Sequence, residues 1–156
     1  MKKDSLPTGK LDVHLLRKYL RKYAMLDERV LLGPGVGEDA AAIDLGDKVL
    51  IVATDPITFA TDEIGYYSVM VNANDVVSTG AEPRWYTVTI LLPEKDATEG
   101  LVDKIFGQIY RACKTLNISL IGGHTEITHG LERPILVGQM MGEVQKEALI
   151  TTAGAE

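Results

Sequence analysis

Hydrophobic positions along the chain follow two periods, one typical of helices and one typical of strands. Apolar residues recur at helical spacing in three stretches, Leu11–Tyr23, Glu63–Gly80 and Glu99–Asn117. β-Rich runs cover Ala40–Leu45, Lys48–Thr54, Trp85–Leu92, Ile118–Ile121 and Pro134–Gly142. The order helix, two strands, helix, strand, helix, two strands predicts an α/β domain of the α+β kind, with a two-layer mixed sheet and helices on one face.

Capping and turn residues indicate where several of these elements begin and end. Asp62 precedes the second helix and is expected to cap its first turn, with Gly80 as its stop. Asp96 and Glu99 resemble a capping box at the start of the third helix. The short strand Ile118–Ile121 is apolar, so we expect it to be buried before it runs into a glycine-rich loop.

The second helix combines apolar residues nearly all round with three polar ones, Asn72, Asn74 and Asp75. A helix that is apolar on every side is typically buried. Buried polar side chains cost free energy unless they are hydrogen-bonded or paired with a charge. These residues therefore either cap neighbouring backbone or face a site. We favour a site for Asp75, because a buried carboxylate needs a cation or hydrogen-bond donors.

A glycine-rich stretch, Gly33–Ile43, leads into the first hairpin, and the carboxylates Glu38 and Asp39 directly follow its glycines. Its glycines allow a sharp turn and a close approach to a ligand. Asp55 follows the next apolar run, so carboxylates stand at both ends of the hairpin. This arrangement favours oxygen ligands around a hard cation and a phosphate chain. An ordinary surface turn remains an alternative of similar weight on these residues alone.

The same stretch contains a dinucleotide-binding fingerprint that we reject. Gly35, Gly37 and Ala40 fit the spacing G-x-G-x-x-A. That fingerprint requires a preceding strand and a following helix. Here a helical stretch precedes the glycines and a strand follows them, so the context is wrong.

A second glycine-rich segment, Gly122–Glu126, follows the strand Ile118–Ile121. Gly122 and Gly123 leave backbone N–H groups free for phosphate oxygens, and Thr125 and Glu126 add possible ligands. His124 could bind a metal, although a single histidine more often serves as a hydrogen-bonding residue. Cys113 lies on the apolar stripe of the third helix, which predicts a structural thiol in the core.

Composition limits the function classes. The chain has 156 residues and a net charge of −6, which suits one domain with a full core and argues against a nucleic-acid surface. A single cysteine and the lack of a signal-peptide pattern predict a reducing cytoplasm. No apolar run approaches the length that spans a bilayer, so we expect no membrane partner.

Four motifs together resemble the amino-terminal domain of the aminoimidazole ribonucleotide synthetase superfamily, also called PurM-like. The superfamily includes the hydrogenase expression/formation protein HypE, selenophosphate synthetase and thiamine-monophosphate kinase. The resemblance extends from about Leu6 to the chain end and is strongest to HypE-like members. The motifs are Gly37-Glu38-Asp39-Ala40-Ala41, Thr54–Phe59, Asn74–Pro83 and Gly122-Gly123-His124-Thr125-Glu126.

The resemblance implies an ATP site that contains Mg²⁺. Residues matching Asp39, Asp55 and Asp75 hold Mg²⁺ in that family, and Glu126 is expected to join them as a metal ligand. Residues expected to contact the nucleotide are Gly35, Gly37, Asn74, Gly122, Gly123, His124 and Thr125. The superfamily also pairs the sheets of two copies into a barrel-like homodimer, with nucleotide near the interface.

The resemblance further implies a domain division and an activity. Residues 1–10 are expected to form a flexible arm, 11–145 the ATP-binding domain, and 146–156 the start of a linker to an absent carboxy-terminal domain. The implied function is the ATP-binding half of a synthetase or maturation factor that activates a substrate oxygen by phosphoryl transfer. The fragment alone is expected to be inactive. The acceptor is a small molecule or is carried on a protein.

Two alternatives remain open at this point. One is a phosphotransferase similar to thiamine-monophosphate kinase, and the other is a dimerising nucleotide-binding module without turnover. The hydrogenase maturation protein usually has Gly-Asp-Thr where this chain has Gly-His-Thr at positions 123–125, and its acceptor cysteine is absent here. The motifs therefore do not decide the reaction.

Overall fold

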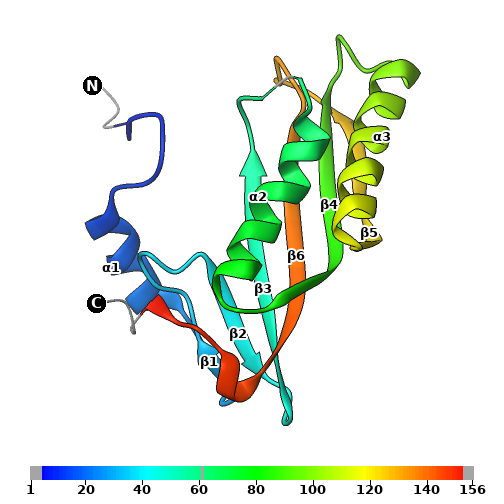
Figure 1. The fold of residues 1–156 in the computed structure, drawn as a ribbon. Helices are drawn as coiled ribbons and strands as arrows, with labels where there is room; N and C mark the ends of the chain where they lie inside the picture. The colour runs from blue at the N-terminus through cyan, green and yellow to red at the C-terminus, as the bar shows by residue number, and fades with distance from the viewer. Residues whose placement is uncertain (1–4, 61, 153–156) are drawn as a thin grey trace.

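The computed structural model describes residues 5–60 and 62–152 (Figure 1). Within these residues six strands form one sheet in the order β1-β2-β3-β6-β4-β5. Strands β4 and β5 are parallel, and all other neighbours are antiparallel, so the predicted mixed sheet is confirmed. The elements are α1 Val13–Tyr23, β1 Val30–Leu32, β2 Ala40–Asp44, β3 Lys48–Ile57, α2 Ile64–Ser78, β4 Glu82–Pro93, α3 Glu99–Leu116, β5 Ser119–Thr128, β6 Ile135–Gln145 and the short 3₁₀ helix η1 Lys146–Ala148.

The core lies between the sheet and helices α2 and α3, which cover the same face (Figure 1). Side chains alternate between the two faces of each strand, and those that face the helices are the buried ones. The buried apolar strand residues include Ala42 of β2, Val49, Ile51 and Ala53 of β3, Tyr86, Val88, Ile90 and Leu92 of β4, and Leu136, Met140 and Val144 of β6. Cys113 of α3 is also buried, as expected, and burial raises the pKa of its thiol to about 11.

The opposite face of the sheet carries no helix in the part of the chain that the structure describes. Half-buried side chains line it, among them Leu50 and Val52 of β3, Leu91 of β4, and Val137 and Met141 of β6. We call this surface the open face. It is apolar and has only neighbouring strands to shield it, which is a feature of surfaces that meet a partner.

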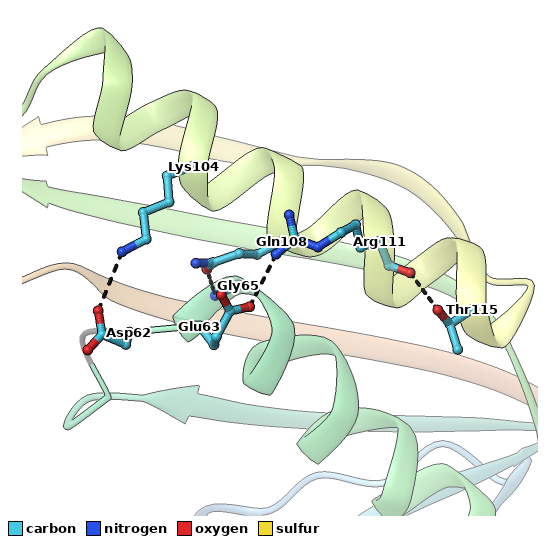
Figure 2. Close-up of polar contacts among 7 residues, drawn as sticks. All are labelled: Asp62, Glu63, Gly65, Lys104, Gln108, Arg111 and Thr115. Atoms are coloured by element: carbon cyan, nitrogen blue, oxygen red, sulfur yellow. Dashed lines mark hydrogen bonds and ion pairs between the residues drawn. The ribbon is translucent and has the colours of Figure 1, made fainter.

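The amino-terminal end of α2 rests on α3 through a buried contact (Figure 2). The Gly65 N–H donates to Gln108 Oε1 at 2.9 Å, and Gln108 is 1% exposed. A Cβ at residue 65 would lie 2.6 Å from the Ile105 carbonyl oxygen, so this approach requires glycine. Exposed pairs Lys104–Asp62 and Arg111–Glu63 flank the contact at 3.4 and 3.2 Å.

Both predicted N-terminal caps are wrong, whereas Gly80, with φ +81°, follows the end of α2 as predicted. Asp62 pairs with Lys104, while Glu63 precedes α2 in a left-handed conformation and makes no side-chain cap. The Gly65 N–H at the start of α2 instead finds its acceptor in Gln108, so that donor needs no local cap. Helix α3 is capped by Thr98, whose hydroxyl accepts from the Leu101 N–H at 3.2 Å, rather than by Asp96 and Glu99.

Strand β5 differs most from expectation. The predicted short buried strand and glycine loop are one ten-residue edge strand, and its residues are almost all exposed. It pairs with β4 from Trp85↔Ser119 to Pro93↔Thr128 with one irregularity, so Gly122–Glu126 lie inside the strand. Strand β1, of three residues, was not predicted, because so short a run shows no period. Helix α2 is buried on one side only, and Val77 is 56% exposed.

The two ends of the chain are described only in part, and the predicted arm and linker stay predictions. Helix α1 begins after Asp12, which accepts from the His14 and Leu15 N–H groups at 3.0 Å, and none of its residues is buried. The expected flexible arm 1–10 and linker 146–156 fall partly on residues 1–4 and 153–156, which lie outside the described residues. Within the described ranges, the helices lack the combination of length and apolar character needed to cross a membrane.

Candidate functional site

Three aspartates from separate parts of the chain come near one another at one end of the sheet. Asp39 directly precedes β2, Asp55 belongs to β3 and Asp75 belongs to α2. Burial, together with the nearby charges of Asp55 and Asp39, raises the pKa of Asp75 to about 6, while Lys10 acts in the opposite direction. The three carboxylates therefore lie within electrostatic reach of one another.

The fold brings these residues together in two steps. The hairpin of β2 and β3 pairs Ala40 with Ala53, which puts Asp39 and Asp55 at the same end of the two strands. Helix α2 packs over β3 and β6 and carries Asp75 on its last turn, close to that end. The three aspartates, which the family resemblance names as metal ligands, are thus brought near one another, and their role as ligands stays a prediction.

The three aspartates do not form a complete metal-binding site by themselves. Among the described residues, no three His, Cys, Asp or Glu side chains are gathered tightly enough to hold a metal ion. Mg²⁺, however, is usually bound by one or two carboxylates, several waters and the phosphates of a substrate. The carboxylate oxygens of these three residues are hard donors, and they therefore suit a cation that arrives with a phosphate chain.

Asn72 is one of the three Asn and Asp residues of α2, and the sequence alone gives it no specific role in the site. Its side chain is fully buried. The Asp55 N–H donates to Asn72 Oδ1 at 2.8 Å, and Asn72 Nδ2 donates to the Asp55 carbonyl at 3.3 Å. Asn74, which was predicted to contact the nucleotide, is exposed on the same helix. The signal available in the sequence was the three-residue spacing between Asn72 and Asp75, which puts both on one helix face.

The first glycine-rich stretch wraps around Asp39. Gly37 has φ +92°, a conformation that favours glycine, and the Glu38 N–H donates to the Gly35 carbonyl at 3.3 Å. Asp39 lines two hollows of about 290 and 270 Å³, one bounded by Ser78, Thr79 and the segment 150–152, the other by Val52 and Thr54. Glu38 accepts a hydrogen bond from the Thr152 hydroxyl, so its side chain is engaged by the carboxy-terminal segment.

The second glycine-rich segment lies on the edge strand β5. A Cβ at Gly123 would lie 2.0 Å from the Val88 carbonyl oxygen, so this glycine is explained by strand packing. His124 Nε2 and Glu126 Oε2 are 3.0 Å apart and exposed. Thr125 lines a hollow of about 370 Å³ between β5 and Phe106 of α3. That hollow is larger than those beside Asp39, but it contains no group of carboxylates.

The structure separates Glu126 from the three aspartates. Asp55 pairs with Gly138, Gly138 with Val88, and Val88 with Gly123, so Gly123 lies three strands from Asp55 in the same row. Three strand spacings amount to about 14 Å. By strand alternation, Asp55 points to the helix side of the sheet, whereas His124 and Glu126 point to the open face. Within one copy of the chain, Glu126 and Asp55 are therefore too far apart to bind the same metal ion.

Comparisons with known proteins show which family the sequence matches. Residues 37–144 match the family described as "AIR synthase related protein, N-terminal domain". A thiamine-monophosphate kinase from Buchnera aphidicola is 28% identical over 123 residues, which are 73% of this chain and 37% of that protein. The chain thus spans little more than a third of the length of this relative.

Solved structures share the fold. The structure described as AaThiL complexed with AMPPCP and TMP superposes with a TM-score of 0.72 at 22% identity, covering 92% of this chain and 44% of the other. The hydrogenase maturation protein HypE in complex with ATP superposes with a TM-score of 0.62 at 20% identity, covering 90% and 38%. At these identities the likeness establishes the fold.

The raised pKa of Asp75 predicts a pH dependence of stability in the metal-free chain. Because the pKa in the folded state, about 6, lies above the ordinary value of 3.8, the folded state binds more protons between these pH values. The free energy of unfolding should therefore fall as pH rises from about 4 to 6. Urea unfolding of Asp75→Asn should lose this component, whereas Asp47→Asn, in the exposed β2–β3 turn, should keep it. An identical pH profile for Asp75→Asn and the wild type would contradict the cluster.

Proposed function

The chain belongs to the family of AIR synthase related N-terminal domains, and we propose that it binds ATP with Mg²⁺. In this proposal it is the nucleotide-binding half of an ATP-dependent phosphotransferase or synthetase. The observation that carries the proposal is the convergence of Asp39 and Asp55 on Asp75, from three separate parts of the chain.

Electrostatics gives the reason for a cation. Three carboxylates and a triphosphate carry charge of the same sign, so they repel unless a cation stands between them. When bound, Mg²⁺ neutralises phosphate charge and orients an in-line transfer. Asp39, Asp55 and Asp75 would hold it. The positive charge of Lys10 acts to lower the pKa of Asp75. Lys10 therefore adds a positive group near the site.

The site offers surroundings that suit a phosphate chain. The backbone at Gly37 adopts a left-handed conformation that favours glycine, which has no side chain to occupy the turn. The hollow bounded by Val52 and Thr54 opens beside Asp39. These features position the nucleotide and its cation, whereas no residue of the chain is assigned to the transfer step itself.

The acceptor is proposed in two versions. The first is an oxygen of a small or protein-borne substrate, as in a HypE-like maturation factor. The second is thiamine monophosphate, which the similarity to a thiamine-monophosphate kinase favours. ADP release by the protein with its remaining domain, with and without thiamine monophosphate, separates them. Binding of ATP without any release would instead support a module without turnover.

We also propose that two copies pair through their open faces. The apolar strands β3, β6 and β4 leave Val52, Val137 and Leu91 partly exposed on that face. Glu126 points to the open face, and Asp39 lines a hollow beside Val52 and Thr54 of that same face, so a symmetric pair could place Gly122–Glu126 of one copy near Asp39 of the other. This arrangement would reconcile the predicted ligand Glu126 with its distance from Asp55.

Replacing single carboxylates tests the nucleotide site. Asp39→Asn removes a formal charge at nearly constant shape and should weaken Mg-ATP binding at least about tenfold, the equivalent of about 1.4 kcal/mol. Glu38→Gln should change the affinity little, because the Glu38 side chain bonds to the Thr152 hydroxyl and an amide can keep that bond. Calorimetry of both variants measures this. Loss of binding in Glu38→Gln alone would show that the wrong carboxylate was assigned.

A charge on the open face tests the dimer. The wild type should sediment as a dimer at micromolar concentration, and Val137→Arg should sediment as a monomer, because an arginine there would be desolvated in the interface. Tyr110→Arg, on the outer side of α3 where Tyr110 is 63% exposed, serves as the control and should leave the dimer intact. A wild type that is monomeric, or a dimeric Val137→Arg, would count against pairing through this face.

A further inference from the structure

Asp55 lies at a place where its backbone has lost its neighbouring strand. Strand β2 begins at Ala40, which pairs with Ala53, so β2 does not extend to Asp55. On its other side β3 continues beside β6 as far as Ile57↔Leu136. The N–H and C=O of one residue in an antiparallel strand point to the same side. Unless another group replaced β2 there, the Asp55 backbone would lack a partner.

The Asn72 side chain takes the place of the missing strand. Its Oδ1 accepts from the Asp55 N–H at 2.8 Å, and its Nδ2 donates to the Asp55 carbonyl at 3.3 Å. One amide thus satisfies both backbone groups, as the opposite residue of a strand would. Because buried backbone groups are costly when unpaired, this contact fixes where β3 stands relative to α2.

The amide itself is held in one orientation. Nδ2 also donates to the Ser68 carbonyl at 2.8 Å, one helical turn earlier. Gly138 of β6 leaves room for it, since a Cβ there would lie 2.5 Å from Asn72 Nδ2 and 2.5 Å from the Tyr86 hydroxyl oxygen. On the opposite face, Thr54 Oγ1 donates to the Gly138 carbonyl at 2.8 Å. Asn72 is fully buried, so solvent does not compete for its bonds.

We propose that Asn72 is a positioning residue that sets the separation of Asp55 from Asp75 and thereby the affinity of the site for its divalent cation. Asn72 and Asp75 are three residues apart on α2 and share a helix face. Asn72 therefore ties the backbone of one candidate ligand to the helix that carries another. This inference rests on the proposed cation site and adds a residue that touches neither cation nor nucleotide.

Mn²⁺ binding by the metal-free 156-residue chain tests the proposal, because this ion reports on oxygen ligands by electron paramagnetic resonance. Asn72→Ala should lower the affinity for Mn²⁺ about tenfold, as expected when a group that orients a ligand is lost. It should also increase the exchange rate of the Asp55 amide hydrogen without any metal present. Unchanged Mn²⁺ affinity in a folded Asn72→Ala chain would overturn the proposal.

Tyr86→Phe provides the matched control. It removes the 2.5 Å contact between the Tyr86 hydroxyl and Ser68 Oγ, both fully buried, so it loses a hydrogen bond from the same region. It leaves both bonds to Asp55 in place and should keep the wild-type Mn²⁺ affinity and Asp55 exchange rate. An equal loss of affinity in Tyr86→Phe would show a general effect of destabilisation and would overturn the specific role of Asn72.

A measurement on the wild type keeps the test valid if Asn72→Ala does not fold. The side-chain amide signals of Asn72 should shift during a Mg²⁺ titration with the same midpoint as the Asp55 amide. Static Asn72 signals while Asp55 shifts would overturn the coupling. A wild type that binds neither Mn²⁺ nor Mg²⁺ even in the presence of ATP would instead refute the proposed cation site, which is a different outcome from normal binding in the variant.

Discussion

Both the core and the candidate site depend on the contact between helix α2 and strand β3. Val69, Ala73 and Val76 of α2 are buried in the core, while Asn72 bonds to the backbone of Asp55 and Asp75 reaches the same end of the sheet. The apolar contacts fix the helix on the sheet, and that placement lets one buried amide replace a strand. Three carboxylates can then remain close despite their repulsion, because the rest of the helix is held independently of them.

The second constraint is the coverage of the sheet by helices on one face only. This leaves apolar positions on the open face and free edges at β1 and β5. Sheet edges and apolar faces are surfaces that proteins normally cover or protect. The proposed pairing through the open face covers it, and the same pairing offers a function for the exposed segment Gly122–Glu126, which in a single copy lies away from the aspartates.

The sequence predicted the parts of the fold and site that depend on local pattern. The hydrophobic period predicts the helices and most strands, and the motifs single out the carboxylates at positions 39, 55 and 75. Other features depend on tertiary contacts. Asn72 matters because β2 ends at Ala40, and Asp62 does not cap α2 because Gln108 reaches the Gly65 N–H from α3. Gly122–Glu126 were expected in a loop because glycines often mark turns, whereas parallel pairing with β4 makes them a strand.

The central claim is that Asp39, Asp55 and Asp75 hold the cation of a bound nucleotide. Paramagnetic broadening of backbone amide signals by substoichiometric Mn²⁺ in the presence of ATP tests it most directly, since broadening falls steeply with distance from the ion. The account predicts that the amides of these three aspartates and of Gly37 broaden first. Broadening centred on the hollow beside Phe106, or no saturable broadening at all, would contradict it.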